Sequence, residues 1–183
     1  IKLDPSNVNA WMAMGQVAWK KGDVVQAKHL FEESLKHGET KEAYQDLSMI
    51  TRQIPRQTQE GAGGGAKDRG EIMQDSINLA KKAIALDIND HKSWYILGNA
   101  LCMNFFTVTN DIFDLNKALA AYKKSESLGG ECNPDLFYNR GNVHRYMQNY
   151  ASAIESYKRT VDIDPSSFTQ TNDALLDVTH FVN

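Results

Sequence analysis

The stretch NPDLFYNRGNVHRYMQNYASAIESYKRTVDIDP, residues 133–165, contains two amphipathic helical segments joined by a short Asn-Tyr turn. Gly141 and Ala153 are small, so two antiparallel helices can approach closely at these points. Phe137 and Tyr157 supply the bulk that fills the space beside them. The closing Asp-Pro ends the second helix, because proline has no N–H and disfavours helix in the residue before it. Because one such pair cannot bury its apolar face alone, the stretch predicts stacked neighbours.

The order of these residues resembles the tetratricopeptide repeat, a unit of about 34 residues with the pattern W-x2-L-G-x2-Y, A-x3-F and P. Phe137 takes the tryptophan place and Tyr157 the phenylalanine place, while Gly141 matches directly. Arg140 stands where leucine is usual, and His144 where tyrosine is usual. The resemblance implies an all-α fold, a right-handed superhelical solenoid of stacked helix pairs.

The same pattern recurs through the chain and predicts four helix pairs within residues 1–165. Their expected bounds are 8–40, 41–88, 91–130 and 134–165. A glycine-rich loop at 54–70 interrupts the second pair, and an insertion at 104–114, which is apolar enough to pack back on the body, lengthens the third. Residues 166–183 predict one more amphipathic helix, which either caps the array or begins a further repeat.

Composition excludes several classes of protein. The chain has 183 residues, 42% of them hydrophobic, and a net charge of -3, so we expect no direct nucleic-acid binding. No apolar run approaches the roughly 18 residues of a membrane span. The opening residues Ile1–Pro5 resemble the end of a repeat, and we expect the chain to be a segment of a longer protein. Cys102 and Cys132 lie in a predicted helix and a predicted loop, which favours a reducing compartment.

We find no pattern typical of catalysis. No histidine stands at a metal-ligand spacing from another histidine or a cysteine, and no CxxC or HExxH occurs. The glycine-rich loop lacks G-x-x-x-x-G-K-[ST] and follows a helix, so it is no phosphate loop. The sequence therefore predicts a protein that is no enzyme and holds no metal or cofactor.

In the repeat family, certain positions of each first helix line the concave groove of the solenoid. The resemblance carries this role over to Asn9, Met12, Gln16, Trp19, Lys20, Glu42, Gln45, Met49, Arg52, Gln53, Lys92, Tyr95, Asn99, Cys102, Met103, Asp135, Tyr138, Asn142, Arg145 and Tyr146. Amides can hydrogen-bond a peptide backbone, and tyrosines offer contact area. Arg52 can take a carboxylate in bidentate fashion, and Asp135 a cation. The alternative is that these are ordinary solvated groove residues.

Four strings, VAWKKGD, LSMITRQ, SWYILGN and NPDLFYNR, resemble a narrower family that recognises the N-terminal peptide of nascent tubulin at the ribosome and triggers tubulin mRNA decay. The resemblance implies that Arg52 meets the acid of the peptide Met-Arg-Glu-Ile, and Asp135 its arginine. It also implies a stress-responsive nuclear role beside an acetyltransferase coactivator, and hence a location in cytoplasm and nucleus.

Two departures from that family are expected to matter. Thr169 stands where the family has a second acid for the peptide arginine, so that contact is weaker or another acid such as Asp173 substitutes. The family also has a C-terminal domain with an oligonucleotide-binding-like fold and an N-terminal helical segment, neither of which is in this sequence. Two alternatives stay open: a transcription scaffold that binds through the convex face or the insertions, and a co-chaperone that captures chaperone tails. The latter lacks its usual lysine-rich clamp here.

Overall fold

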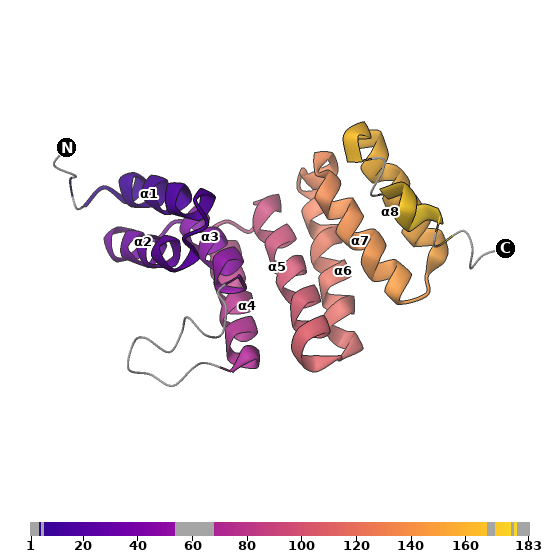
Figure 1. The fold of residues 1–183 in the computed structure, drawn as a ribbon, viewed down its shortest axis with the longest axis horizontal. Helices are drawn as coiled ribbons and strands as arrows, with labels where there is room; N and C mark the ends of the chain where they lie inside the picture. The colour runs from indigo at the N-terminus through magenta and orange to yellow at the C-terminus, as the bar shows by residue number, and fades with distance from the viewer. Residues whose placement is uncertain (1–3, 5, 54–67, 168–170, 177, 179–183) are drawn as a thin grey trace.

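The computed structural model describes residues 4, 6–53, 68–167, 171–176 and 178, and the regular structure within these ranges is helical. Eight long helices pair and stack from the N-terminal to the C-terminal end of the chain (Figure 1). They are α1 (Val8–Lys20), α2 (Val24–His37), α3 (Lys41–Thr51), α4 (Arg69–Leu86), α5 (His91–Asn104), α6 (Ile112–Ser127), α7 (Pro134–Tyr146) and α8 (Tyr150–Ile163). The predicted all-α solenoid is therefore confirmed. None of the described helices is long and apolar enough to cross a membrane.

Polar side chains determine where the helices begin. Asp23 caps α2 by accepting a hydrogen bond from the Gln26 N–H at 3.0 Å, and Thr40 caps α3 in the same way. Asp68 and Glu71 form a capping box at the start of α4. Each cap satisfies N–H groups that the first helical turn leaves without a partner.

A glycine of the first helix faces an aromatic ring of the second in three of the four pairs. A Cβ atom added at the glycine would lie about 2.4–2.7 Å from two carbons of that ring, which no real Cβ tolerates. The facing pairs are Gly15 with Phe31, Gly98 with Tyr122, and Gly141 with Tyr157. All three rings are fully buried, so the absence of a side chain at glycine lets the helices close around them.

The interruptions differ in extent from the prediction. Residues 54–67 lie outside the described residues, and α4 already begins at Arg69, inside the predicted loop 54–70. The predicted insertion 104–114 is mostly helical, because α5 continues into a π-helix at Phe105–Thr109 and α6 starts at Ile112. Phe105 is buried, as expected of a segment that packs on the body, whereas Phe106 and Phe113 are exposed.

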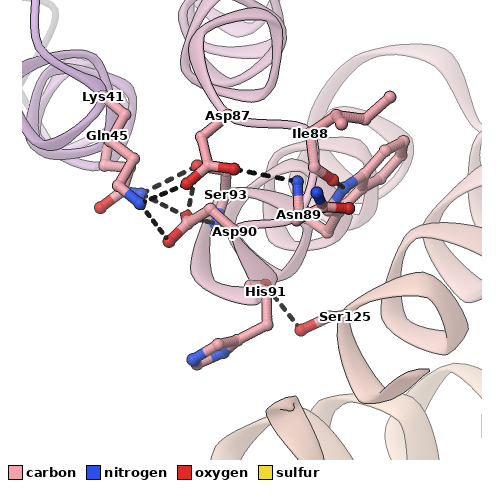
Figure 2. Close-up of polar contacts among 10 residues, drawn as sticks. Lys41, Gln45, Asp87, Ile88, Asn89, Asp90, His91, Ser93 and Ser125 are labelled. Atoms are coloured by element: carbon pink, nitrogen blue, oxygen red, sulfur yellow. Dashed lines mark hydrogen bonds and ion pairs between the residues drawn. The ribbon is translucent and has the colours of Figure 1, made fainter. Parts of the chain in front are cut away.

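A polar network joins the second pair of helices to the third (Figure 2). Lys41 Nζ donates to Asp87 Oδ2 at 2.7 Å and to Asp90 Oδ1 at 3.1 Å. Gln45 Nε2 donates to Asp90 Oδ2 at 2.7 Å and to Ser93 Oγ at 2.8 Å. Partial burial raises the pKa of Asp90, but the hydrogen bonds from Ser93 and Lys41 outweigh it and leave that pKa below its ordinary value. Asp90 is therefore charged at neutral pH and links α3 to α5.

We expect Asp90→Ala to lower the free energy of unfolding by about 2 kcal/mol. About half comes from the lost cap of α5, where Asp90 accepts from the Ser93 N–H, and the rest from removing one of the two acceptors of the buried Gln45 amide nitrogen, which keeps Ser93 Oγ. Urea unfolding followed by circular dichroism measures it. Asp111→Ala is the matched control, because Asp111 caps α6 through one exposed bond to the Phe113 N–H; equal losses would contradict the network's role.

The C-terminal end of the array is covered. Residues 171–176 are helical, and Ala174 and Val178 are buried against Ala153 and Tyr157 of α8. The remaining residues after 167 lie outside the described part of the chain, and Thr169 is among them. The expected effect of Thr169 at the family's acidic position therefore stays a prediction.

Candidate functional site

A pocket of about 350 Å³ opens between α3, α5 and α7, the first helices of the last three pairs. It is lined by Arg52, Asn99, Cys102, Met103, Phe106, Tyr122, Asn139, Asn142 and Val143. On one side of the pocket, Asn99, Cys102 and Met103 of α5 and Phe106 just after it follow the i, i+3, i+4, i+7 spacing of a helix face. On the other side, Asn139, Asn142 and Val143 of α7 follow the same spacing, and Tyr146 continues it.

Arg52 brings a positive charge into this pocket from the C-terminal end of α3. Its Nε donates to the Ser48 carbonyl at 3.2 Å. Burial lowers the pKa of the guanidinium from its ordinary value, yet arginine stays protonated at neutral pH. No ion pair within the described residues involves Arg52. A desolvated cation is costly without an anion beside it, so the pocket favours an acidic ligand.

Tyrosine side chains hold the asparagines of the pocket. The Tyr122 hydroxyl donates to Asn99 Oδ1 at 2.7 Å, and the Tyr157 hydroxyl donates to Asn142 Oδ1 at 2.8 Å. The Asn139 amide nitrogen donates to Asn99 Oδ1 at 3.0 Å and to the Tyr95 hydroxyl at 3.4 Å, and the Asn99 side chain also bonds to Tyr95. Together with the guanidinium, the Asn142 amide nitrogen is the donor that these contacts leave for carboxylate or carbonyl oxygens.

The thiol of Cys102 in the pocket is not activated. Its Sγ lies 3.4 Å from the Tyr122 hydroxyl, and burial raises the pKa of Cys102 to about 11. The thiol is therefore protonated at neutral pH, whereas nucleophilic cysteines are thiolates. Both cysteines are free, and the described residues contain no cluster of His, Cys, Asp and Glu that could hold a metal ion.

Five predicted groove residues line the pocket together: Arg52, Asn99, Cys102, Met103 and Asn142. Tyr95 lies beside it, with its hydroxyl 3.4 Å from the Asn139 amide nitrogen. Asp135 is exposed in the first turn of α7; burial raises the pKa of Tyr95, and the negative charge of Asp135 raises it further. The acid therefore lies within electrostatic reach of the pocket wall.

The predicted groove residues of the first repeat lie away from this pocket. Met12 was wrongly assigned to the groove: it is 8% exposed, belongs to the core between α1, α2 and α3, and accepts a hydrogen bond from Ser34. Gln16 donates to Asp46 at 3.3 Å, and Trp19 donates to Gln53 at 2.9 Å. These contacts engage the first two repeats with each other.

The other predicted groove residues do not line the pocket either. Met49 is half-buried and packs on the core around α5, and the ring of Tyr138 lies 5.9 Å from that of Tyr157. Asn9 is exposed on the first turn of α1, and Arg145 is half-buried on α7. Sequence reasoning missed Phe106, Tyr122, Asn139 and Val143, which line the pocket. The sequence did contain a signal for Phe106. It lies seven residues after Asn99, so it continues the spacing of Asn99, Cys102 and Met103 if the first helix runs one turn longer than usual.

A second groove, on the outer side between α6, α7 and α8, is already occupied by its own ion pair. Arg140 Nη1 pairs with Glu126 at 2.7 Å, and its Nε donates to Ser156 at 3.0 Å. The guanidinium carbon also lies 4.7 Å from the centre of the Phe137 ring. These contacts explain why Arg140 stands where the repeat usually has leucine. Arg52, in contrast, has no ion pair among the described residues.

His144 borders this outer groove, and we expect it to make stability depend on pH. Burial, and then the charge of Arg140, lower the pKa of His144 below its ordinary value. The unfolded chain, with a pKa near 6.5, therefore takes up a proton first, so the free energy of unfolding falls as pH drops from about 7 to 5.

Urea unfolding at the two pH values tests this expectation. His144→Gln should reduce the fall in stability, and His29→Gln, at an exposed histidine of α2, should leave it unchanged. An equal fall in both variants would contradict the assignment.

Comparisons with known proteins show what this chain is similar to. Residues 134–167 match the family described as Tetratricopeptide repeat. The chain carries the tetratricopeptide repeat fold. It is 38% identical over 168 residues to tetratricopeptide repeat protein 5 of Bos taurus, and 36% identical over 168 residues to its Homo sapiens counterpart. Each match covers 91% of this chain but 37% of the relative, and it confirms the resemblance predicted from the four strings.

Solved structures agree on the fold of these tetratricopeptide repeats. A Thermus thermophilus repeat protein superposes with a TM-score of 0.74 at 16% identity, covering 97% of this chain and 84% of the other. YrrB, described as a repeat protein with an unusual peptide-binding site, superposes with a TM-score of 0.64 at 21% identity, covering 97% and 76%. At these identities the likeness concerns the fold alone.

Proposed function

We propose that the chain binds the N-terminal peptide of nascent tubulin in the pocket between α3, α5 and α7. The coarser statement, a repeat scaffold that binds peptides or proteins, follows from the fold and the relatives. The observation that carries the finer one is Arg52, a desolvated cation in a pocket that asparagine side chains also line. In Met-Arg-Glu-Ile, the glutamate supplies an anion for Arg52, which has no ion pair among the described residues.

The partner for the peptide arginine is Asp135 of the fourth helix pair, two pairs after the one that supplies Arg52. Asp135 is exposed at the start of α7, and its negative charge raises the pKa of Tyr95. Arg52 comes from α3 and Asp135 from α7, so the two charges lie on opposite sides of α5 along the array. A peptide with neighbouring residues of opposite charge can contact both, and the order of its charges decides the fit.

The expected affinity is modest. A hydrogen bond that involves a charged group contributes about 1.5–3 kcal/mol. Two such anchors and the burial of one apolar side chain give roughly micromolar affinity, about -8 kcal/mol. Attachment to the ribosome near the emerging peptide would raise the effective concentration and compensate for a weak groove.

The deciding experiment is a fluorescence-anisotropy titration with a labelled peptide that begins Met-Arg-Glu-Ile. The comparison peptide has its arginine and glutamate exchanged. We expect the natural order to bind at least tenfold more tightly, a difference of about 1.4 kcal/mol. Asp135→Asn should remove most of this preference, whereas Asp162→Asn, at an exposed acid of α8, should not. Equal binding of both peptides would overturn the proposal.

The nuclear scaffold role beside an acetyltransferase coactivator and the capture of chaperone tails remain alternative proposals. A coactivator bound on the convex face would still be captured after substitutions in the pocket. A chaperone tail would compete with the tubulin peptide through its C-terminal carboxylate, so adding a chaperone C-terminal peptide to the titration separates the two readings.

A further inference from the structure

The pocket changes from polar to apolar along its two parallel walls. On one wall, Asn99 of α5 is followed by Cys102 and Met103 of the same helix and then by Phe106 of the π-helix Phe105–Thr109. On α7, Asn139 and Asn142 give way to Val143 and Tyr146 at the same spacing. Both helices thus place amides in their middle turns and apolar side chains near their C-terminal ends.

Two aromatic rings close the apolar end. The centroid of Phe106 lies 5.1 Å from that of Tyr146, and each ring also packs edge-on against buried Phe105, at 4.9 Å and 5.1 Å respectively. Phe106 is nevertheless 51% exposed, Tyr146 52% and Met103 39%. We call these three side chains the aromatic rim. Buried Phe105 holds the rim in place, while half of each rim ring faces solvent.

The π-helix after α5 creates this feature. Phe105–Thr109 extend the helix by one turn beyond Asn104, and Thr107 and Asn110 bond back to the carbonyls of Met103 and Phe105. Single π-turns within helices are rare and occur frequently at functional sites. Here the extra turn carries Phe106 to the pocket wall, which an ordinary turn after Asn104 would not supply.

We propose that the aromatic rim is a second subsite, which takes a large aliphatic or aromatic side chain lying within two residues of the acidic residue at Arg52. The inference rests on the proposed peptide binding and adds a rule for which acidic peptides bind. Its occupant is part of the same peptide, because Phe106 and Met103 line the same pocket as Arg52.

The size and polarity of the pocket support this occupant. A volume of about 350 Å³ exceeds what one carboxylate fills, and pockets for small ligands are mostly apolar with a few placed polar groups. In an extended peptide, side chains two residues apart point the same way at roughly 7 Å, so one reaches the guanidinium while the other reaches the rim. A charged or small polar side chain at the aromatic rim, in place of a large apolar one, would leave the half-exposed rings in contact with water.

A scan of the residues around one glutamate tests the subsite. Labelled peptides carry a single glutamate in an alanine and glycine background, with leucine placed at each of the four positions within two residues of it. We expect one position to bind at least tenfold more tightly than the leucine-free peptide, since even small additions to an apolar pocket change binding by about 10-fold to 200-fold. Leucine without positional effect overturns the inference.

Variants identify the surface responsible. Phe106→Ala and Tyr146→Ala should each remove the leucine gain, measured as the ratio of the affinities of the leucine-containing and leucine-free peptides for the same variant. Phe113→Ala is the matched control, because Phe113 is 65% exposed on α6 and does not line the pocket. A gain that survives in both rim variants overturns the inference. Failure of the peptide-binding proposal looks different: Arg52→Gln would then leave all peptides unaffected.

Discussion

Replacing Arg52 with glutamine is expected to weaken the binding of an acidic peptide about 100-fold, a loss of roughly 2.7 kcal/mol. The guanidinium supplies the positive charge among the pocket-lining residues, and the asparagines around it offer neutral donors that bind a carboxylate less strongly. Glutamine keeps a similar length and an amide donor but has no charge. Isothermal titration calorimetry with the glutamate-containing tubulin peptide measures the change.

The same substitution should not lower the stability of the protein. Arg52 is desolvated and lacks an ion-pair partner within the described ranges, so its removal relieves an electrostatic cost. Arg159→Gln is the charge-matched control: Arg159 is exposed on α8, outside the pocket, and its loss should leave peptide affinity unchanged. A large loss of stability in Arg52→Gln with intact peptide binding would show that the arginine is structural.

Gly98→Val is expected to lower the free energy of unfolding by about 3 kcal/mol. A Cβ at this position would lie 2.5 Å from the Tyr122 ring, and valine adds two methyl groups beyond it. The ring cannot move aside, because it is fully buried and its hydroxyl is bonded to Asn99. The better helix propensity of valine over glycine is worth only a few tenths of a kcal/mol and does not compensate. Thermal and urea unfolding measure the loss.

Gly98→Val should also disturb the pocket, since Tyr122 positions the Asn99 amide. Ala120→Val on the exposed face of α6 is the control, because it changes propensity without a clash and should cost less than about 1 kcal/mol. Similar losses in the two variants would mean that the glycine is not needed for close helix packing. Peptide titration of the folded fraction would separate a local effect on the pocket from global unfolding.

Local signals in the sequence were sufficient for the architecture. A glycine in the first helix and an aromatic residue in the second recur in three of the four pairs, and turn residues separate the helices, so the pattern alone predicted the solenoid and its helix pairs. Repeat register also placed Arg52, Asn99 and Asn142 on one groove, and the structure brings these three together. This succeeds because each repeat contacts mainly its neighbours, so local periodicity carries over into space.

Tertiary structure decided what register could not. The position of Met12 in the repeat assigned it to the groove, but α2 and α3 pack on it and bury it. Which face of a helix lies inside depends on the neighbouring helices that pack against it. Three features depend on residues far apart in the chain: the desolvation of Arg52, the tyrosine hydroxyls bonded to the asparagine amides, and the contact of Phe106 with Tyr146. Desolvation and contacts between repeats are properties of the packed array, and no single repeat encodes them.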